Sequence, residues 1–107
     1  MDNAYAYFAD LAAEVELPET DRIVSRKLAA GPGAKAVLFG FAAGQELTEH
    51  TSAKPALLHV LEGEARLTLG ADAFDAGAGA WAMMPPNLPH SIAAKTPVRM
   101  LLVLLEG

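Results

Sequence analysis

Short runs of apolar residues, several of them alternating with polar ones, recur along most of this chain. The clearest lie in the middle: Ala56 to Leu61 is apolar except for one histidine, and Glu64 to Leu69 alternates polar and apolar side chains. A period of two is typical of a β-strand with one buried face. Because only Glu62 and Gly63 separate the two runs, the pattern predicts a β-hairpin at this point.

Further strands are predicted on both sides of this hairpin. Residues 21–29 and 35–42 flank Ala30-Gly31-Pro32-Gly33, a strong turn signal because glycine reaches positive φ freely and proline fixes its own φ. Turn residues also separate shorter extended runs towards the C-terminus, at residues 73–76, 81–84, 89–92 and 98–105. Many short strands joined by Gly and Pro turns predict an all-β jelly roll or sandwich.

The first residues follow a helical period instead. Apolar side chains recur at spacings of three and four, namely Tyr5, Phe8, Leu11 and Ala12. With Asn3 as N-cap, residues 3–15 are predicted to form a short amphipathic helix. Pro18 ends it, because proline has no backbone N–H and disfavours helix in the preceding residue. We therefore divide the chain into an N-terminal helix and linker, residues 1–20, and a barrel, residues 21–107.

Composition limits the class of protein. A chain of 107 residues with 52% apolar and 20% charged residues has the composition of one folded domain. The net charge of -5 argues against nucleic acid or an anionic membrane as partner. The absence of cysteine, of a signal-peptide pattern and of any apolar run longer than Met100 to Leu105 leads us to expect a cytoplasmic protein.

Two stretches place a histidine after a glycine turn and an extended segment. The first contains Gly44, His50 and Gly63, and the second contains Gly79, Pro85 and His90. These residues and their spacing resemble the two motifs of the cupin superfamily of small jelly-roll barrels. The resemblance covers residues 44–94 and implies a double-stranded β-helix, the cupin jelly-roll barrel, with both histidines facing one cavity.

The resemblance also implies a candidate metal site. In cupins two histidines and a glutamate of the first motif, with the histidine of the second, bind the metal ion. Only His50 and His90 carry over, because Ser52 and Ala56 stand at the other two positions. Glu46 shares the strand parity of His50 and is a candidate third ligand. The ion would be divalent: Fe, Zn, Mn or Ni.

A pocket without a metal is the other interpretation of the two histidines. An imidazole exchanges protons near neutral pH, so His50 and His90 can act as acid or base or bind a ligand. Ser52 shares the parity of His50 and is expected in the same pocket. Trp81 and Met83 share one face of their strand; they belong either to the core or to an apolar wall beside His90.

Two further features bear on the surface. His59 has the opposite parity to Ala56, so we expect it to point away from the barrel interior and leave it out of the site. The runs 56–61 and 98–105 are apolar on both faces. Because an exposed apolar sheet face favours association, we expect a homodimer formed through the outer face.

Three functions agree with the resemblance. The leading hypothesis is a small single-domain cupin that binds a small molecule in a barrel cavity containing His50, Ser52 and His90. The alternative is a mononuclear metal-dependent enzyme of the oxygenase or isomerase type, with a reduced ligand set. The third is a non-catalytic oligomeric structural domain with a vestigial site. A fold alone does not choose among them.

Overall fold

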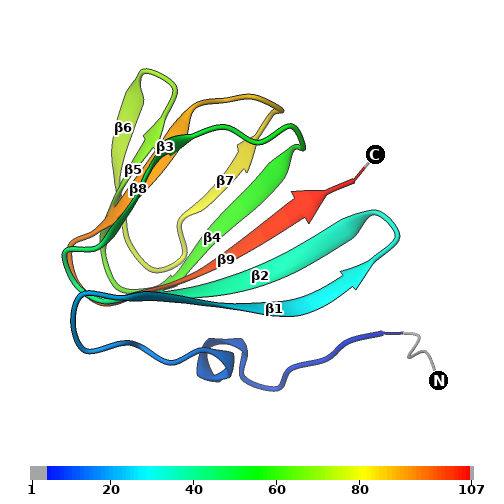
Figure 1. Ribbon diagram of the computed structural model, residues 1–107, viewed down its shortest axis with the longest axis horizontal. Helices are drawn as coiled ribbons and strands as arrows, with labels where there is room; N and C mark the ends of the chain where they lie inside the picture. The colour runs from blue at the N-terminus through cyan, green and yellow to red at the C-terminus, as the bar shows by residue number, and fades with distance from the viewer. Residues whose placement is uncertain (1–4, 107) are drawn as a thin grey trace.

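The computed structural model describes residues 5–106 and folds them into two antiparallel β-sheets (Figure 1). Sheet A has the strand order β1-β2-β9-β4-β7, and sheet B has the order β3-β8-β5-β6. The strands are β1 (Ile23–Gly31), β2 (Ala34–Phe41), β3 (Glu46–His50), β4 (Ala56–Glu62), β5 (Ala65–Leu69), β6 (Asp72–Ala76), β7 (Trp81–Met84), β8 (His90–Ala94) and β9 (Val98–Leu105). The predicted all-β jelly-roll architecture is confirmed. No helix within the described residues is long and apolar enough to cross a membrane.

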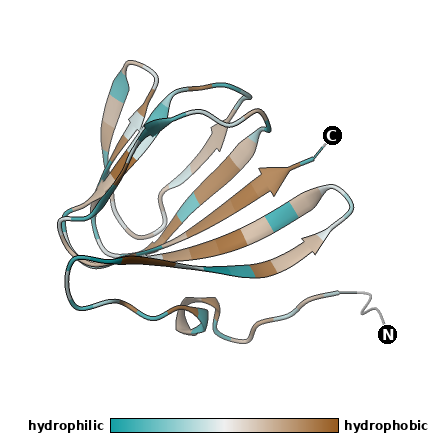
Figure 2. Cartoon of the chain, viewed as in Figure 1, coloured by the Kyte–Doolittle hydropathy of each residue, from teal (hydrophilic) through white to brown (hydrophobic). Residues whose placement is uncertain are grey.

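The hydrophobic core lies between the inner faces of the two sheets. On β4, Ala56, Leu58 and Val60 are at most 2% exposed, whereas the residues between them are only partly buried. Sheet B contributes alternate residues in the same way, among them Leu67 of β5 and Ile92 of β8. Figure 2 shows apolar residues concentrated on β2, β4 and β9, the central strands of sheet A. The alternation in the sequence therefore corresponds to an alternation between core and surface.

Two predicted turns join paired strands. Gly31 pairs with Ala34 across the β1–β2 turn, in which Gly33 has a φ of 93°. The β5–β6 turn contains Gly70, with a φ of 61°. Glycine adopts positive φ without the steric cost that a Cβ brings, so both turns form where the sequence predicts them.

The predicted hairpin between residues 56–61 and 64–69 is wrong. Strand β4 pairs with β7 and β9 in sheet A, whereas β5 pairs with β6 and β8 in sheet B. The chain crosses from one sheet to the other at Gly63, which has a φ of 90°. Periodicity identifies a strand and its buried face, but it does not identify the strand's partner.

The N-terminal helix predicted over residues 3–15 is also wrong for the described residues. Within residues 5–106 the only helical segment is a single 3-10 turn at Leu11–Glu14, and Tyr5 and Tyr7 are 79% and 77% exposed. Figure 1 shows the segment running beside β1 and β2 without a longer helix. Asn3, the predicted N-cap, lies outside the described residues. An isolated short helix is marginal in water, so contacts with the sheet decide the conformation here.

Arg99, Gly40 and Arg26 all contact this segment from sheet A, and Arg26 Nη1 donates to the carbonyl and carboxylate oxygens of Glu14. Arg99 Nε donates a hydrogen bond to Val15 O (3.0 Å), and its Nη1 donates to both carboxylate oxygens of Glu62 (2.8 and 3.0 Å). The Glu16 carbonyl oxygen lies so close to Gly40 that a Cβ added there would be 2.1 Å from it. The extended segment therefore covers part of the outer face of sheet A.

We predict that Gly63→Ala destabilises the protein more than Gly79→Ala. Both glycines have positive φ, but a Cβ at Gly63 would lie 2.0 Å from Pro97 O, whereas a Cβ at Gly79 would meet nothing within 4 Å. Gly79→Ala should cost about 1 kcal/mol of unfolding free energy from backbone strain alone. Gly63→Ala should cost about 3 kcal/mol because the clash is added. Urea denaturation measures both; equal losses would contradict the close packing at the crossing.

Candidate functional site

His50 and His90 meet at one end of sheet B. His50 is the last residue of β3 and His90 is the first of β8, and the two residues are paired across the strands. Their ring centroids are 4.2 Å apart and their planes are inclined by 59°. His90 is 8% exposed, whereas His50 is exposed. The structure therefore brings together the two residues that the motif spacing singled out.

An irregularity in β3 determines which side chains accompany them. Leu47 pairs with Ile92 and His50 pairs with His90, so three steps along β3 match two steps along β8. One extra residue in a strand is a β-bulge, and it reverses the parity beyond it. Glu46, which pairs with Ala93, is the neighbour of Leu47 in β3. Neighbouring residues of a strand point to opposite faces of the sheet, so Glu46 points away from the face that carries Leu47 and His50. The prediction that Glu46 shares the face of His50 is wrong, because it assumed an unbroken strand.

Each imidazole is oriented by its own strand. His50 Nδ1 lies 2.7 Å from Thr48 O, and His90 Nδ1 lies 2.9 Å from Leu88 O. A carbonyl oxygen only accepts, so Nδ1 carries the hydrogen and donates it in both rings. In the neutral ring Nε2 then has a free lone pair, and no hydrogen bond among the described residues uses it. The pair thus presents two similar acceptor nitrogens.

Ser52 lies two residues beyond the end of β3 and takes part in a turn. Its hydroxyl accepts a hydrogen bond from the Lys54 backbone N–H (3.2 Å). Its carbonyl oxygen accepts one from the Asn87 backbone N–H (2.7 Å). Ser52 therefore joins the loop after β3 to the loop before β8, the two loops that carry the chain away from His50 and into His90.

Trp81 and Met83 do not point into the core. They are 58% and 62% exposed, whereas Ala82 and Met84, which alternate with them on β7, are 9% and 1% exposed. His59, which pairs with Trp81, is likewise on the partly exposed face of β4, as its parity predicts. The interpretation of Trp81 and Met83 as core residues is wrong, because the residues of β7 that face sheet B are Ala82 and Met84.

Trp81 and Met83 instead border a cavity of about 400 Å³, which we call the seam cavity. It lies between β6 and β7, the edge strands of the two sheets. The cavity is lined by Leu67, Leu69, Phe74, Asp75, Ala76, Ala80, Trp81, Ala82 and Met83. Leu69 is paired with His90, so the seam cavity begins one strand away from the histidine pair. Leu67, Leu69 and Phe74 were not predicted as site residues, although the alternation of Leu67 and Leu69 already placed these two on one face of a strand.

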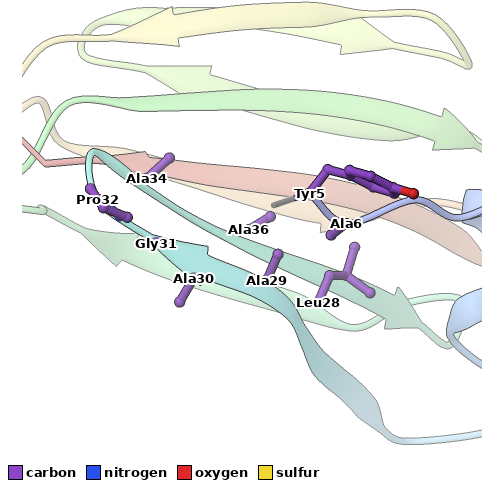
Figure 3. A pocket seen from close by; sticks show the side chains of 9 residues that line it. All are labelled: Tyr5, Ala6, Leu28, Ala29, Ala30, Gly31, Pro32, Ala34 and Ala36. Carbon is purple, nitrogen blue, oxygen red and sulfur yellow. The ribbon is translucent and has the colours of Figure 1, made fainter. Parts of the chain in front are cut away.

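A second cavity, of about 500 Å³, lies between the N-terminal segment and the β1–β2 hairpin (Figure 3). Tyr5 lies at one side of it, and its other walls are alanine, glycine, proline and Leu28. None of these lining residues is a histidine, a carboxylate or a cation. This cavity therefore offers few polar groups to a ligand, and neither His50 nor His90 lines it.

The donor set does not fit a tightly bound resident metal ion. Within residues 5–106, no group of three or more His, Cys, Asp or Glu side chains is placed to hold a metal. Structural zinc sites use four protein ligands and catalytic zinc sites three. His50 and His90 supply two, and Glu46 faces the other side of the sheet. Any ion at this pair would therefore depend on water or on a ligand for most of its coordination.

Comparison with known proteins agrees with this fold and with the two motifs. The family model described as Cupin domain matches residues 37–104, which is more than half of the chain. The chain therefore belongs to the cupin family. No curated protein matches it.

Solved structures resemble the chain over most of its length. A conserved protein of unknown function from Streptococcus pyogenes is 29% identical, with a TM-score of 0.83, covering 100% of this chain and 91% of that one. A cupin superfamily protein from Desulfitobacterium hafniense is 30% identical, also with a TM-score of 0.83, covering 91% and 88% of the two chains. A Cupin 2 conserved barrel domain protein from Leptotrichia buccalis is 33% identical, with a TM-score of 0.78, covering 88% of this chain and 46% of that one.

We predict that both histidines carry their neutral-state hydrogen on Nδ1. The two carbonyl oxygens, Thr48 O and Leu88 O, lie within hydrogen-bond distance of these nitrogens and favour that tautomer. Long-range ¹H–¹⁵N correlation spectra at alkaline pH distinguish the protonated nitrogen of each ring. His59, which has no such bond among the described residues, is the internal reference. A hydrogen on Nε2 of His50 or His90 would contradict the orientation of the site.

Proposed function

We propose that this cupin binds a small molecule at the His50–His90 pair. The observation that carries the proposal is the pairing of the two rings. Their centroids are 4.2 Å apart, and each ring donates a hydrogen bond from Nδ1 to a backbone carbonyl oxygen. A ligand hydroxyl or N–H donates to a free Nε2, and an imidazole that takes up a proton donates from the same atom. One ligand group can therefore contact both rings.

Burial supports a recognition role for the pair. His90 is nearly buried, on the face of β8 that also carries the core residues Ile92 and Ala94. No buried side-chain nitrogen or oxygen among residues 5–106 lacks a hydrogen-bond partner, so the unbonded Nε2 of His90 is accessible to a ligand although most of the side chain is buried. The exposed ring of His50 leaves one side of the pair open to solvent. His50 thus marks the entry and His90 the inner end of the proposed site.

We predict that stabilisation by a bound ligand in thermal unfolding disappears in His50→Ala and persists in His59→Ala. Thermal unfolding would be followed with a panel of small acids, sugars, alcohols and phenols. A ligand at about a hundred times its Kd stabilises the folded state by about 2.7 kcal/mol. His50 is exposed, so its replacement should leave the fold intact. A ligand that stabilises His50→Ala and wild type equally would move the site elsewhere.

We further predict that protein purified without chelator contains no stoichiometric Fe, Zn, Mn or Ni. Two imidazoles alone hold a divalent ion weakly, because catalytic sites use about three protein ligands. Elemental analysis of dialysed protein measures the metal content. One equivalent of metal in the wild type, lost in both His50→Ala and His90→Ala, would overturn this proposal in favour of the metal-dependent enzyme.

A further inference from the structure

We infer that the ligand is an uncharged, largely apolar small molecule with one proton-donating group. Its apolar body would occupy the seam cavity, and its hydroxyl or N–H would donate to Nε2 of His90. The inference rests on the proposed function of the histidine pair. It adds the second half of the binding site and the chemical class of the ligand.

The strand register connects the seam cavity with the histidine pair. His50, His90 and Leu69 are paired in succession across β3, β8 and β5, so their side chains lie side by side on one face of sheet B. The neighbouring row continues from Leu67 on β5 to Phe74 on β6. Leu67, Leu69 and Phe74 all line the cavity. A molecule beside His90 that extends across sheet B therefore meets an apolar surface at once.

The exposure of Phe74 shows that the described strands leave this part of sheet B uncovered. Phe74 lies on the same face of sheet B as the buried Leu67, yet it is 49% exposed. Sheet A ends at β7, so no further strand of sheet A covers it. A cavity of about 400 Å³ is within the range of small-molecule sites, about 300–1,000 Å³. The volume and the uncovered ring fit a ligand of aromatic size.

The charges around the cavity argue against an anionic group inside it. No lysine or arginine is among its lining residues, and Asp75 is the one charged residue that lines it. The Asp75 carboxylate is bound by Lys95 Nζ (2.6 Å) and Arg66 Nη1 (3.0 Å). Hydrogen bonds first from Lys95 and then from Arg66 lower the pKa of Asp75, so this group stays ionised. A ligand carboxylate inside the cavity would find no cation among the lining residues.

The test uses phenol as the probe, because it combines an aromatic ring with one donating hydroxyl. We expect saturable binding of phenol by NMR titration of the 107-residue protein, and binding of benzoate at least about tenfold weaker. Phe74→Ser should weaken phenol binding about tenfold, which corresponds to about 1.4 kcal/mol. Tyr7→Ser removes an exposed aromatic ring that does not line the cavity and should leave the affinity unchanged.

The histidine variants separate this inference from the proposed function. If His50→Ala and His90→Gln weaken phenol binding but Phe74→Ser does not, the pair binds the ligand and the inference about the seam cavity is overturned. If Phe74→Ser weakens binding but neither histidine variant does, the proposed function is overturned and the cavity binds apolar molecules alone. Benzoate binding as tight as phenol, or no binding of phenol, overturns the inference about ligand class.

Discussion

The burial of two sheet faces against each other is the constraint on which the rest of this structure depends. Each strand must turn one set of alternate side chains inward, and the apolar side chains of β4, β5, β8 and β9 satisfy this requirement. Gly63 allows consecutive strands to enter different sheets, because a side chain there would collide with Pro97. Arg99 then binds both the end of β4 and the N-terminal segment. The fold thus relies on parity along strands and on close contacts between them.

The candidate site lies where this parity is interrupted. The extra residue between Leu47 and His50 turns the imidazole to the face of His90, and the same irregularity leaves Glu46 on the opposite face. A metal site built on the ligands of the cupin family needs histidine and carboxylate on one side of the sheet. In this chain Ala56 stands at the position of that glutamate, and the bulge leaves Glu46 on the opposite face from His50. The local geometry therefore favours a pair of acceptors over a cluster of metal ligands.

Much of the fold could be predicted from the sequence, and the failures have identifiable physical causes. The bounds of β7 and β9 followed from short apolar runs bounded by turn residues, and the Gly31-Pro32-Gly33 turn followed from glycine and proline geometry. The pairing of β4 with β7 and β9 could not be predicted in this way, because strand pairing depends on residues distant in the sequence. The N-terminal helix failed because contacts such as Arg99 with Val15 outweigh weak local propensity.

The candidate site divides in the same way. The meeting of His50 and His90 followed from motif spacing, but the face of Glu46 did not, because a single inserted residue in β3 leaves no mark in the hydrophobic pattern. Periodicity also does not identify β6 and β7 as edge strands. An inward-facing side chain such as Phe74 occupies the same alternating position in the sequence whether or not another strand covers it. Sheet closure and bulges decide which inward positions become core and which remain exposed. The proposed binding site of this cupin therefore lies where the regular strand pattern ends.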